Sequence, residues 1–100
     1  MSMQTLMQQA QKMQRELQKA QAEFAKKAFT GTNGGAVTVT LLGSREVTKV
    51  DIDEVMLTKD DKDMLEEMIK NAVNDALGKI SKAEIEVNQR ITGRSGGLGL

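Results

Sequence analysis

The sequence predicts an α+β fold: a long helix, a small three-stranded antiparallel sheet and a second long helix, in that order. Apolar residues recur with helical spacing over residues 3–24 and again over 65–87. Between them, residues 37–41 alternate between apolar and polar as a half-buried strand does. A chain of 100 residues has the length of one small domain, and it buries a limited fraction of its surface, which favours oligomerisation.

The first helix is predicted from apolar residues separated by alternating steps of three and four. They are Met3, Leu6, Ala10, Met13, Leu17, Ala20 and Phe24, called here the seam. A repeat of this kind is typical of a helix that packs along another helix. The pattern leaves open whether the seam packs on the chain's own last helix or on a partner's. Lys27 occupies the next seam position, which predicts that the helix ends there.

A turn is predicted at residues 30–35, which read TGTNGG. The Asn33-Gly34 pair indicates a type I′ hairpin turn, in which both central residues need a positive φ angle. Turn formation is the preferred explanation for Gly31, Gly34 and Gly35. Neither a GxGxxG nor a GK[ST] pattern is present, so these glycines do not indicate a phosphate-binding loop.

Three strands are predicted around this turn. Residues 37–42 form one, residues 46–52 form another with Val50 and Ile52 on one face, and a short strand near residues 27–30 precedes them. Gly43-Ser44 offers the second tight turn. A sheet this small has two edges, and pairing with a second copy at one edge is physically attractive.

The second helix is predicted from about Lys59 to about Arg90, with Thr58 as its cap and aspartates in its first turn. The acidic residues of this region do not match an EF-hand loop, so a helix start is preferred over a metal site. The face is formed by Leu65, Ile69, Ala72, Ala76, Ile80, Ala83 and Val87, broadened by Met64, Met68, Val73 and Leu77. Gly78 marks either a close helix contact or a change of direction. Residues 1–90 thus form one domain, and the glycine-rich residues 91–100 are expected to be a flexible tail.

The composition argues against catalysis. The chain has no His, Cys, Trp, Tyr or Pro, and no carboxylate, Lys or Ser set appears at a telling spacing. We therefore expect no enzyme, no catalytic residue, no metal site, no cofactor and no small-molecule substrate. No run of residues is long and apolar enough to span a membrane, and the N-terminus does not read as a signal peptide, so a cytoplasmic protein is expected.

The net charge is zero, but charge is segregated along the chain. Residues 1–29 carry five basic and two acidic side chains, whereas residues 59–89 carry five basic and eight acidic ones. In the heptad of the first helix, Lys12, Lys19 and Lys26 share one position, so each lies about 10.5 Å from the next along the helix axis. Arg15 lies beside them. This basic stripe, Lys12, Arg15, Lys19 and Lys26, lies opposite the seam. It is either an ordinary solvated helix surface or a surface that binds an anionic partner.

Four segments of the chain, in this order, resemble a known family. They are LMQQAQKMQRELQKAQAEF at residues 6–24, TGTNGGAVTVTLLG at 30–43, VTKVDIDEVML at 47–57 and DDKDMLEEMIKNAVNDALGKI at 60–80. The chain resembles the YbaB/EbfC family of bacterial nucleoid-associated proteins. The resemblance implies a cytoplasmic, nucleoid-associated homodimer of α-β-β-β-α protomers, whose helices project like the arms of a tweezer. It also implies DNA binding and an influence on gene expression.

The sequence indicates two candidate functions. In the first, the homodimer binds double-stranded DNA through phosphate contacts from the basic stripe, with Arg90 and Arg94 adding contacts. In the second, the chain is a dimeric adaptor whose methionine-rich face, with Met3, Met7 and Met13, takes a partner helix.

Overall fold

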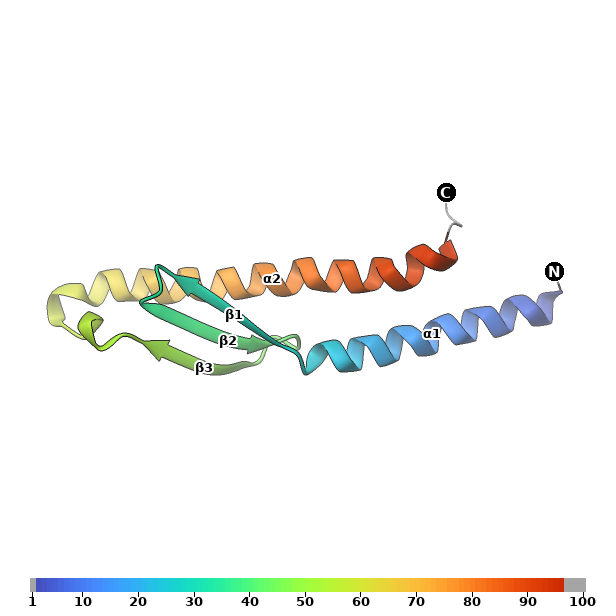
Figure 1. Ribbon diagram of the computed structural model, residues 1–100, viewed down its shortest axis with the longest axis horizontal. Helices are drawn as coiled ribbons and strands as arrows, with labels where there is room; N and C mark the ends of the chain where they lie inside the picture. The colour runs from blue at the N-terminus through green and yellow to red at the C-terminus, as the bar shows by residue number, and fades with distance from the viewer. Residues whose placement is uncertain (1, 97–100) are drawn as a thin grey trace.

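The computed structural model describes residues 2–96, and the side chains of residues 2–93. Its elements follow the predicted order (Figure 1). They are helix α1 (Met3–Ala25), strands β1 (Ala28–Asn33), β2 (Val37–Leu42) and β3 (Val47–Ile52), the single-turn 3-10 helices η1 (Glu54–Met56) and η2 (Lys59–Asp61), and helix α2 (Lys62–Gly96). The predicted α+β fold is confirmed.

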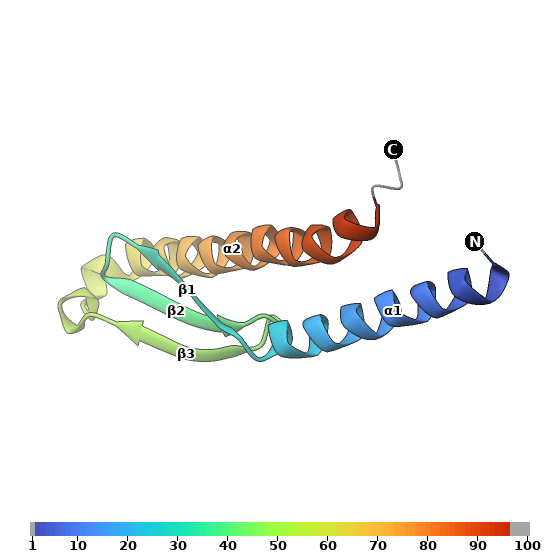
Figure 2. The same cartoon turned by 45° about the vertical axis from the view of Figure 1, so that its right-hand side comes forward.

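The molecule is elongated, with principal extents of 70 × 24 × 15 Å. Figures 1 and 2 show α2 lying along the sheet, while α1 leaves the sheet beside the second half of α2 and extends past its end. We call α1 the arm, and the sheet together with α2 the body.

The arm begins with a side-chain cap, and hydrogen bonds from Gly43 and Ser44 of the β2–β3 turn hold its other end. We call these hydrogen bonds the clasp. The Ser2 hydroxyl accepts a hydrogen bond from the Thr5 N–H at 3.1 Å, which satisfies one of the donors left free at a helix start. At the other end, the turn between β2 and β3 donates from Gly43 N–H to the Lys27 carbonyl at 2.8 Å and from Ser44 N–H to the Ala25 carbonyl at 3.2 Å. The helix therefore ends where Lys27 interrupts the seam, as predicted, and the turn holds that end.

The strands form an antiparallel sheet in the order β1-β2-β3. Val50 pairs with Val39 and Ile52 with Val37, which places Val50 and Ile52 on the same face of the sheet, as predicted. The first turn differs from the prediction. β1 continues through Asn33, and the positive φ angles belong to Gly34 (62°) and Gly35 (79°). Gly34-Gly35, rather than Asn33-Gly34, is therefore the pair that needs a left-handed backbone.

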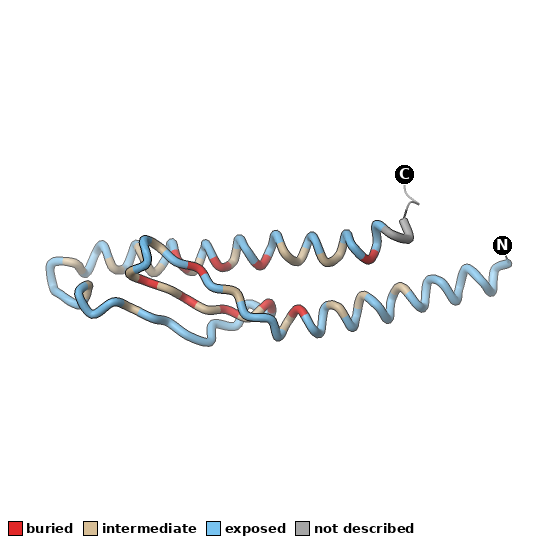
Figure 3. The backbone as a smooth tube through the Cα atoms, viewed as in Figure 1, coloured by how far each residue is buried: buried red, intermediate tan, exposed pale blue. Residues whose placement is uncertain are grey.

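The core lies between β2 and α2 (Figure 3). The fully buried residues are Val37, Val39 and Leu41 of β2 with Ala72, Ala76 and Ile80 of α2. Gly31 of β1 is buried as well, and a Cβ there would overlap the Ala72 carbonyl oxygen and the Ala76 nitrogen. The prediction that Gly31 serves a turn is therefore wrong: it lets β1 cross α2 at backbone contact.

The start of α2 agrees with the prediction. The Thr58 hydroxyl accepts from the Asp61 N–H at 3.2 Å, and the acidic turn η2 leads directly into α2. In the interior of α2, a Cβ on Gly78 would meet nothing within 4 Å, so this glycine does not mark a close contact.

The end of α2 differs from the prediction. The helix continues to Gly96, so the expectation that regular structure stops after Arg90 is wrong. Ile91 is buried, and the Thr92 hydroxyl donates to the Asn88 carbonyl at 2.7 Å. This burial offsets the low helix propensity of the glycines. Residues 97–100 of the predicted tail lie outside the described residues.

Burial of the seam decreases along the arm from the sheet outward (Figure 3). Phe24 is buried, with its ring centroid 5.3 Å from that of Phe29. Met13, Leu17 and Ala20 are half-buried, whereas Met3, Leu6 and Ala10 are exposed. Since α1 contacts α2, the seam packs on the chain's own last helix near the sheet, and its outer half is uncovered.

Candidate nucleic-acid interface

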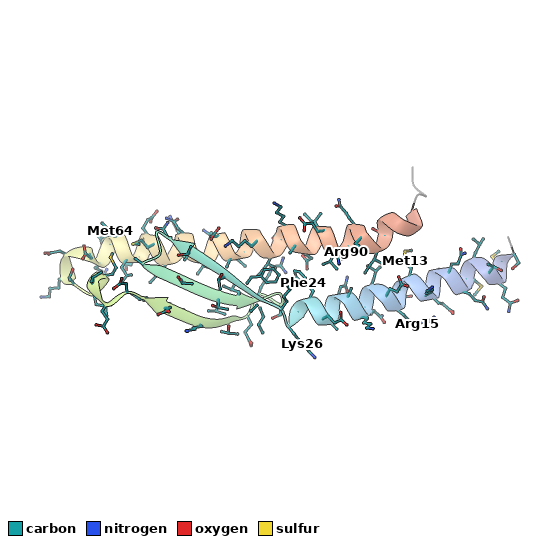
Figure 4. The ribbon with its side chains drawn as sticks, in the orientation of Figure 1. Met13, Arg15, Phe24, Lys26, Met64 and Arg90 are labelled. Carbon is teal, nitrogen blue, oxygen red and sulfur yellow. The ribbon has the colours of Figure 1, made fainter. Side chains whose placement is uncertain are left out.

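The basic stripe occupies the outer face of the arm. Lys12, Arg15, Lys19 and Lys26 are all exposed, and Figure 4 shows Arg15 and Lys26 on the side of α1 turned away from α2. Seven-residue spacing keeps the three lysines in register over about 21 Å of helix axis. The heptad pattern thus produces one basic face, as the sequence predicted.

The cations of the stripe are not engaged in ion pairs within the side chains that the structure describes. The ion pairs there are Arg45–Glu84, Lys62–Glu66, Lys70–Glu67 and Lys79–Asp75, all of which lie in the body. A lysine or arginine with no intramolecular ion pair is available to an external anion, and exposure keeps the desolvation cost of reaching phosphate low. The stripe is therefore suited to contact a polyanion.

The two other predicted arginines do not belong to this face. Arg90 is exposed, but it comes from α2, the opposite helix (Figure 4). Arg94 lies in the last turns of α2, and its side chain is outside the described set. Of the six predicted residues, the structure brings four together on one surface.

The opposite end of the molecule is acidic. Residues 50–67 cover the end of β3, the two 3-10 turns and the start of α2, and they contain eight acidic residues against two lysines. This end lies far from the arm (Figure 1). This end repels a polyanion, so the charge distribution favours the arm over this end as the surface for an anionic partner.

Lys27 is a cation at the base of the arm that sequence reasoning did not select. It is exposed, and its Nζ lies 5.6 Å from the centroid of the Phe29 ring. Its position interrupts the seam, so the heptad pattern identified it only as a helix end. The cation pair Lys26-Lys27 is the signal that would have identified Lys27 as a further exposed cation at the base of the arm.

Other site types find no support in the described part of the chain. Within residues 2–96, no group of three or more His, Cys, Asp or Glu side chains is arranged to hold a metal ion. No helix in the same range is long and apolar enough to cross a membrane.

Fold and surface together define a class: small α+β proteins in which a basic amphipathic helix projects from a three-stranded sheet. The model of the YbaB/EbfC DNA-binding family matches residues 1–95. The chain belongs to the YbaB/EbfC family, a family of nucleoid-associated DNA-binding proteins and not of enzymes.

Relatives and a solved structure agree with this assignment. The chain is 48% identical over 96 residues to nucleoid-associated proteins of Xanthomonas axonopodis pv. citri and Xanthomonas oryzae pv. oryzae, covering 95% of this chain and 86% of each relative. The crystal structure of an uncharacterised protein from Helicobacter pylori superposes with a TM-score of 0.72 at 22% identity, covering 87% of this chain and 92% of that one. The latter likeness supports the fold.

Proposed function

We propose that the protein binds double-stranded DNA as a homodimer, through phosphate contacts made by the outer faces of its two arms. The observation that carries this proposal is the basic stripe, whose cations are exposed and unpaired within the described side chains. Membership in a DNA-binding family supports it.

Phosphate contacts alone position a protein on DNA without reading sequence. The stripe offers lysines and an arginine and no aromatic side chain, since Phe24 is buried and Phe29 half-buried. Stacking on the bases of single strands is therefore disfavoured, and duplex DNA is the proposed partner.

The homodimer is proposed to form at β3. In the described chain, the outer edge of β3 has no strand partner, and an unpaired edge readily adds another strand. Val47 and Val50 of β3 are 48% and 51% exposed, and Val55 and Leu57 just beyond are 70% and 63% exposed. Covering these residues with a second copy removes apolar surface from water at one continuous face. The two arms of such a dimer carry two basic stripes.

We propose that the protein acts in the cytoplasm on the nucleoid, where its binding influences nucleoid organisation and gene expression. The support is the family membership and the name nucleoid-associated protein carried by the relatives.

The adaptor remains a second candidate because of the outer half of the arm. Met3 and Met7 are 74% and 55% exposed, and flexible methionines suit contact with a partner helix. A mobility-shift titration with random-sequence duplex separates the two, since the adaptor does not require DNA.

The stripe is tested by changing Lys12, Arg15 and Lys19 together to Gln. Each phosphate contact contributes about 0.9 to the slope of log K against log salt, so three lost contacts should lower that slope by about 2.7 per protomer. Duplex binding should weaken correspondingly at low salt. Fluorescence anisotropy with labelled duplex at a series of salt concentrations measures both quantities.

A matched control removes the same charge from the body. Changing Lys59 and Lys62 of the acidic end, together with Lys70 just beyond it, to Gln should leave the salt slope unchanged. Light scattering checks that all variants keep the mass of the unmodified protein, expected to be twice 10.9 kDa. Identical isotherms for the stripe variant and the unmodified protein at two salt concentrations would contradict the assignment.

A further inference from the structure

A pocket of about 360 Å³ lies where the base of the arm, the β2–β3 turn and α2 meet. This volume is within the range of small-molecule sites. The residues that matter for its chemistry are Gln21, Phe24, Arg45, Glu84, Val87 and Asn88. None of them belongs to the basic stripe, so the pocket is independent of the proposed DNA surface.

The floor of the pocket is apolar and fixed in place. Phe24 is buried against Phe29, and Val87 is half-buried on α2 (Figure 4 shows Phe24 between the arm and α2). Gly43 packs directly on the Phe24 backbone, and a Cβ there would overlap the Phe24 carbonyl oxygen. The floor can receive a small aliphatic group without rearranging the backbone.

Two side chains of opposite charge line one side of the pocket, called here the wall. The Arg45 Nη2 lies 3.2 Å from Glu84 Oε1, with the two side chains 42% and 43% exposed. An ion pair this accessible contributes little to stability, so a ligand can open it at small cost. Arg45 also has a φ of 77°, which is rare outside glycine. Arg45 lines the pocket from this position in the β2–β3 turn.

Asn88 of α2 also lines the pocket. Among the described side chains, its Oδ1 is the buried polar atom that has no hydrogen-bond partner. Because protein atoms cover this oxygen, a ligand in the pocket does not contact it directly.

We propose that this pocket binds a small zwitterion with an apolar side chain, of the α-amino acid class. The ligand carboxylate pairs with the Arg45 guanidinium, whose fork matches its two oxygens. The ligand ammonium donates to the Glu84 carboxylate, and the ligand side chain rests on Phe24 and Val87. A simple anion would face Glu84 and a simple cation would face Arg45, so only a molecule with both charges is complementary to the wall.

The test uses the full-length ¹⁵N-labelled protein and L-leucine as the probe, titrated to about 10 mM, which would nearly saturate a site with a dissociation constant of about 1 mM. Saturable shifts of the Arg45, Glu84 and Asn88 amide signals are expected. Three analogues each lack one group: 4-methylpentanoate has no ammonium, 3-methylbutylamine has no carboxylate and glycine has no side chain. Each should bind about tenfold more weakly or worse, since each forfeits a charge-assisted bond or the apolar contact.

Variants locate the site. Arg45→Gln and Glu84→Gln should each weaken leucine binding about tenfold, whereas Lys62→Gln, which removes a more exposed ion pair elsewhere on α2, should not change it. Circular dichroism confirms that each variant is folded, and Glu84→Gln preserves the shape of the wall if Arg45→Gln proves unstable. The proposal is overturned if leucine causes no saturable shift, if 4-methylpentanoate binds as tightly as leucine, or if both pocket variants bind leucine normally.

Discussion

The two long helices share an apolar repeat but use it differently. In α2, Ala72, Ala76 and Ile80 are completely buried because the sheet lies against them. In α1, only Phe24 is buried, and the outer half of the seam faces water. A helical repeat therefore produces a core only where a second layer of structure covers it. The body supplies the buried core of the single chain, whereas the arm leaves the outer half of its seam exposed to solvent.

The largest expected effect is a loss of stability in the body. Gly31→Ala should destabilise the protein by about 3 kcal/mol or more, because the added methyl overlaps backbone atoms of α2 that cannot move independently. For a domain of this length, each kcal/mol lowers the melting temperature by about 4–8 °C. Thermal unfolding followed by circular dichroism measures the effect, and a melting temperature equal to that of the unmodified protein would refute the close β1–α2 contact.

The next largest effect is a loss of stability at the junction between the arm and the body. Gly43→Ala should cost about 1–3 kcal/mol, because the new Cβ overlaps the Phe24 carbonyl oxygen and weakens the clasp at the end of α1. Amide shifts should concentrate in the last turn of α1 and in the β2–β3 turn. Shifts of equal size throughout the β2–α2 core would show that the arm and the body are not separable in this way.

A smaller effect has the opposite sign. Gly78→Ala should stabilise the protein by about 1 kcal/mol, since alanine has the higher helix propensity and its Cβ meets open space. Chemical denaturation should show a higher midpoint with an unchanged slope. Because it adds the same methyl group, this variant is also the matched control for Gly31→Ala. Destabilisation here would indicate that this face of α2 is covered by another molecule.

The smallest effect is a pH dependence within the body. The Thr32 backbone N–H, donating to Asp75 at 3.1 Å, and the nearby Lys79 ammonium hold the pKa of Asp75 below its ordinary value of 3.8. A lowered folded pKa stabilises the native state above pH 3.8, and this contribution is lost as the pH falls through the folded pKa. When the pH is lowered from 7 to below 3.8, the free energy of unfolding should therefore decrease less for Asp75→Asn than for the unmodified protein. Denaturant midpoints at pH 7 and pH 3 provide the comparison, and equal losses would exclude the role of Asp75.

Local patterns in the sequence were sufficient to predict the order of the helices and strands and one face of the candidate site. The alternation of Val37, Val39 and Leu41 predicted the buried face of β2, and the heptad predicted a basic face opposite the seam. Both depend on residues close in sequence, whose positions follow from the periods of a strand and a helix.

The features missed by sequence reasoning depend on contacts between distant residues. Gly31 reads as a turn residue until Ala72, about forty positions later, is known to lie against it. The last turns of α2 read as an irregular tail because their glycines disfavour a helix, whereas the burial of Ile91 extends it. The pocket joins Gln21, Arg45 and Asn88 from three separate elements, and no local pattern links them.

The clasp at the base of α1 has a mechanical consequence. The arm is about 34 Å long, its base is held by the β2–β3 turn, and the outer half of its seam is uncovered, so a change in this turn alters the direction of the arm. A rotation of about 10° at the turn displaces the free end by about 6 Å and Lys12, the outermost cation, by about 3 Å. In the proposed DNA complex, a modest adjustment of Gly43 and Ser44 therefore shifts the basic stripe relative to the phosphates.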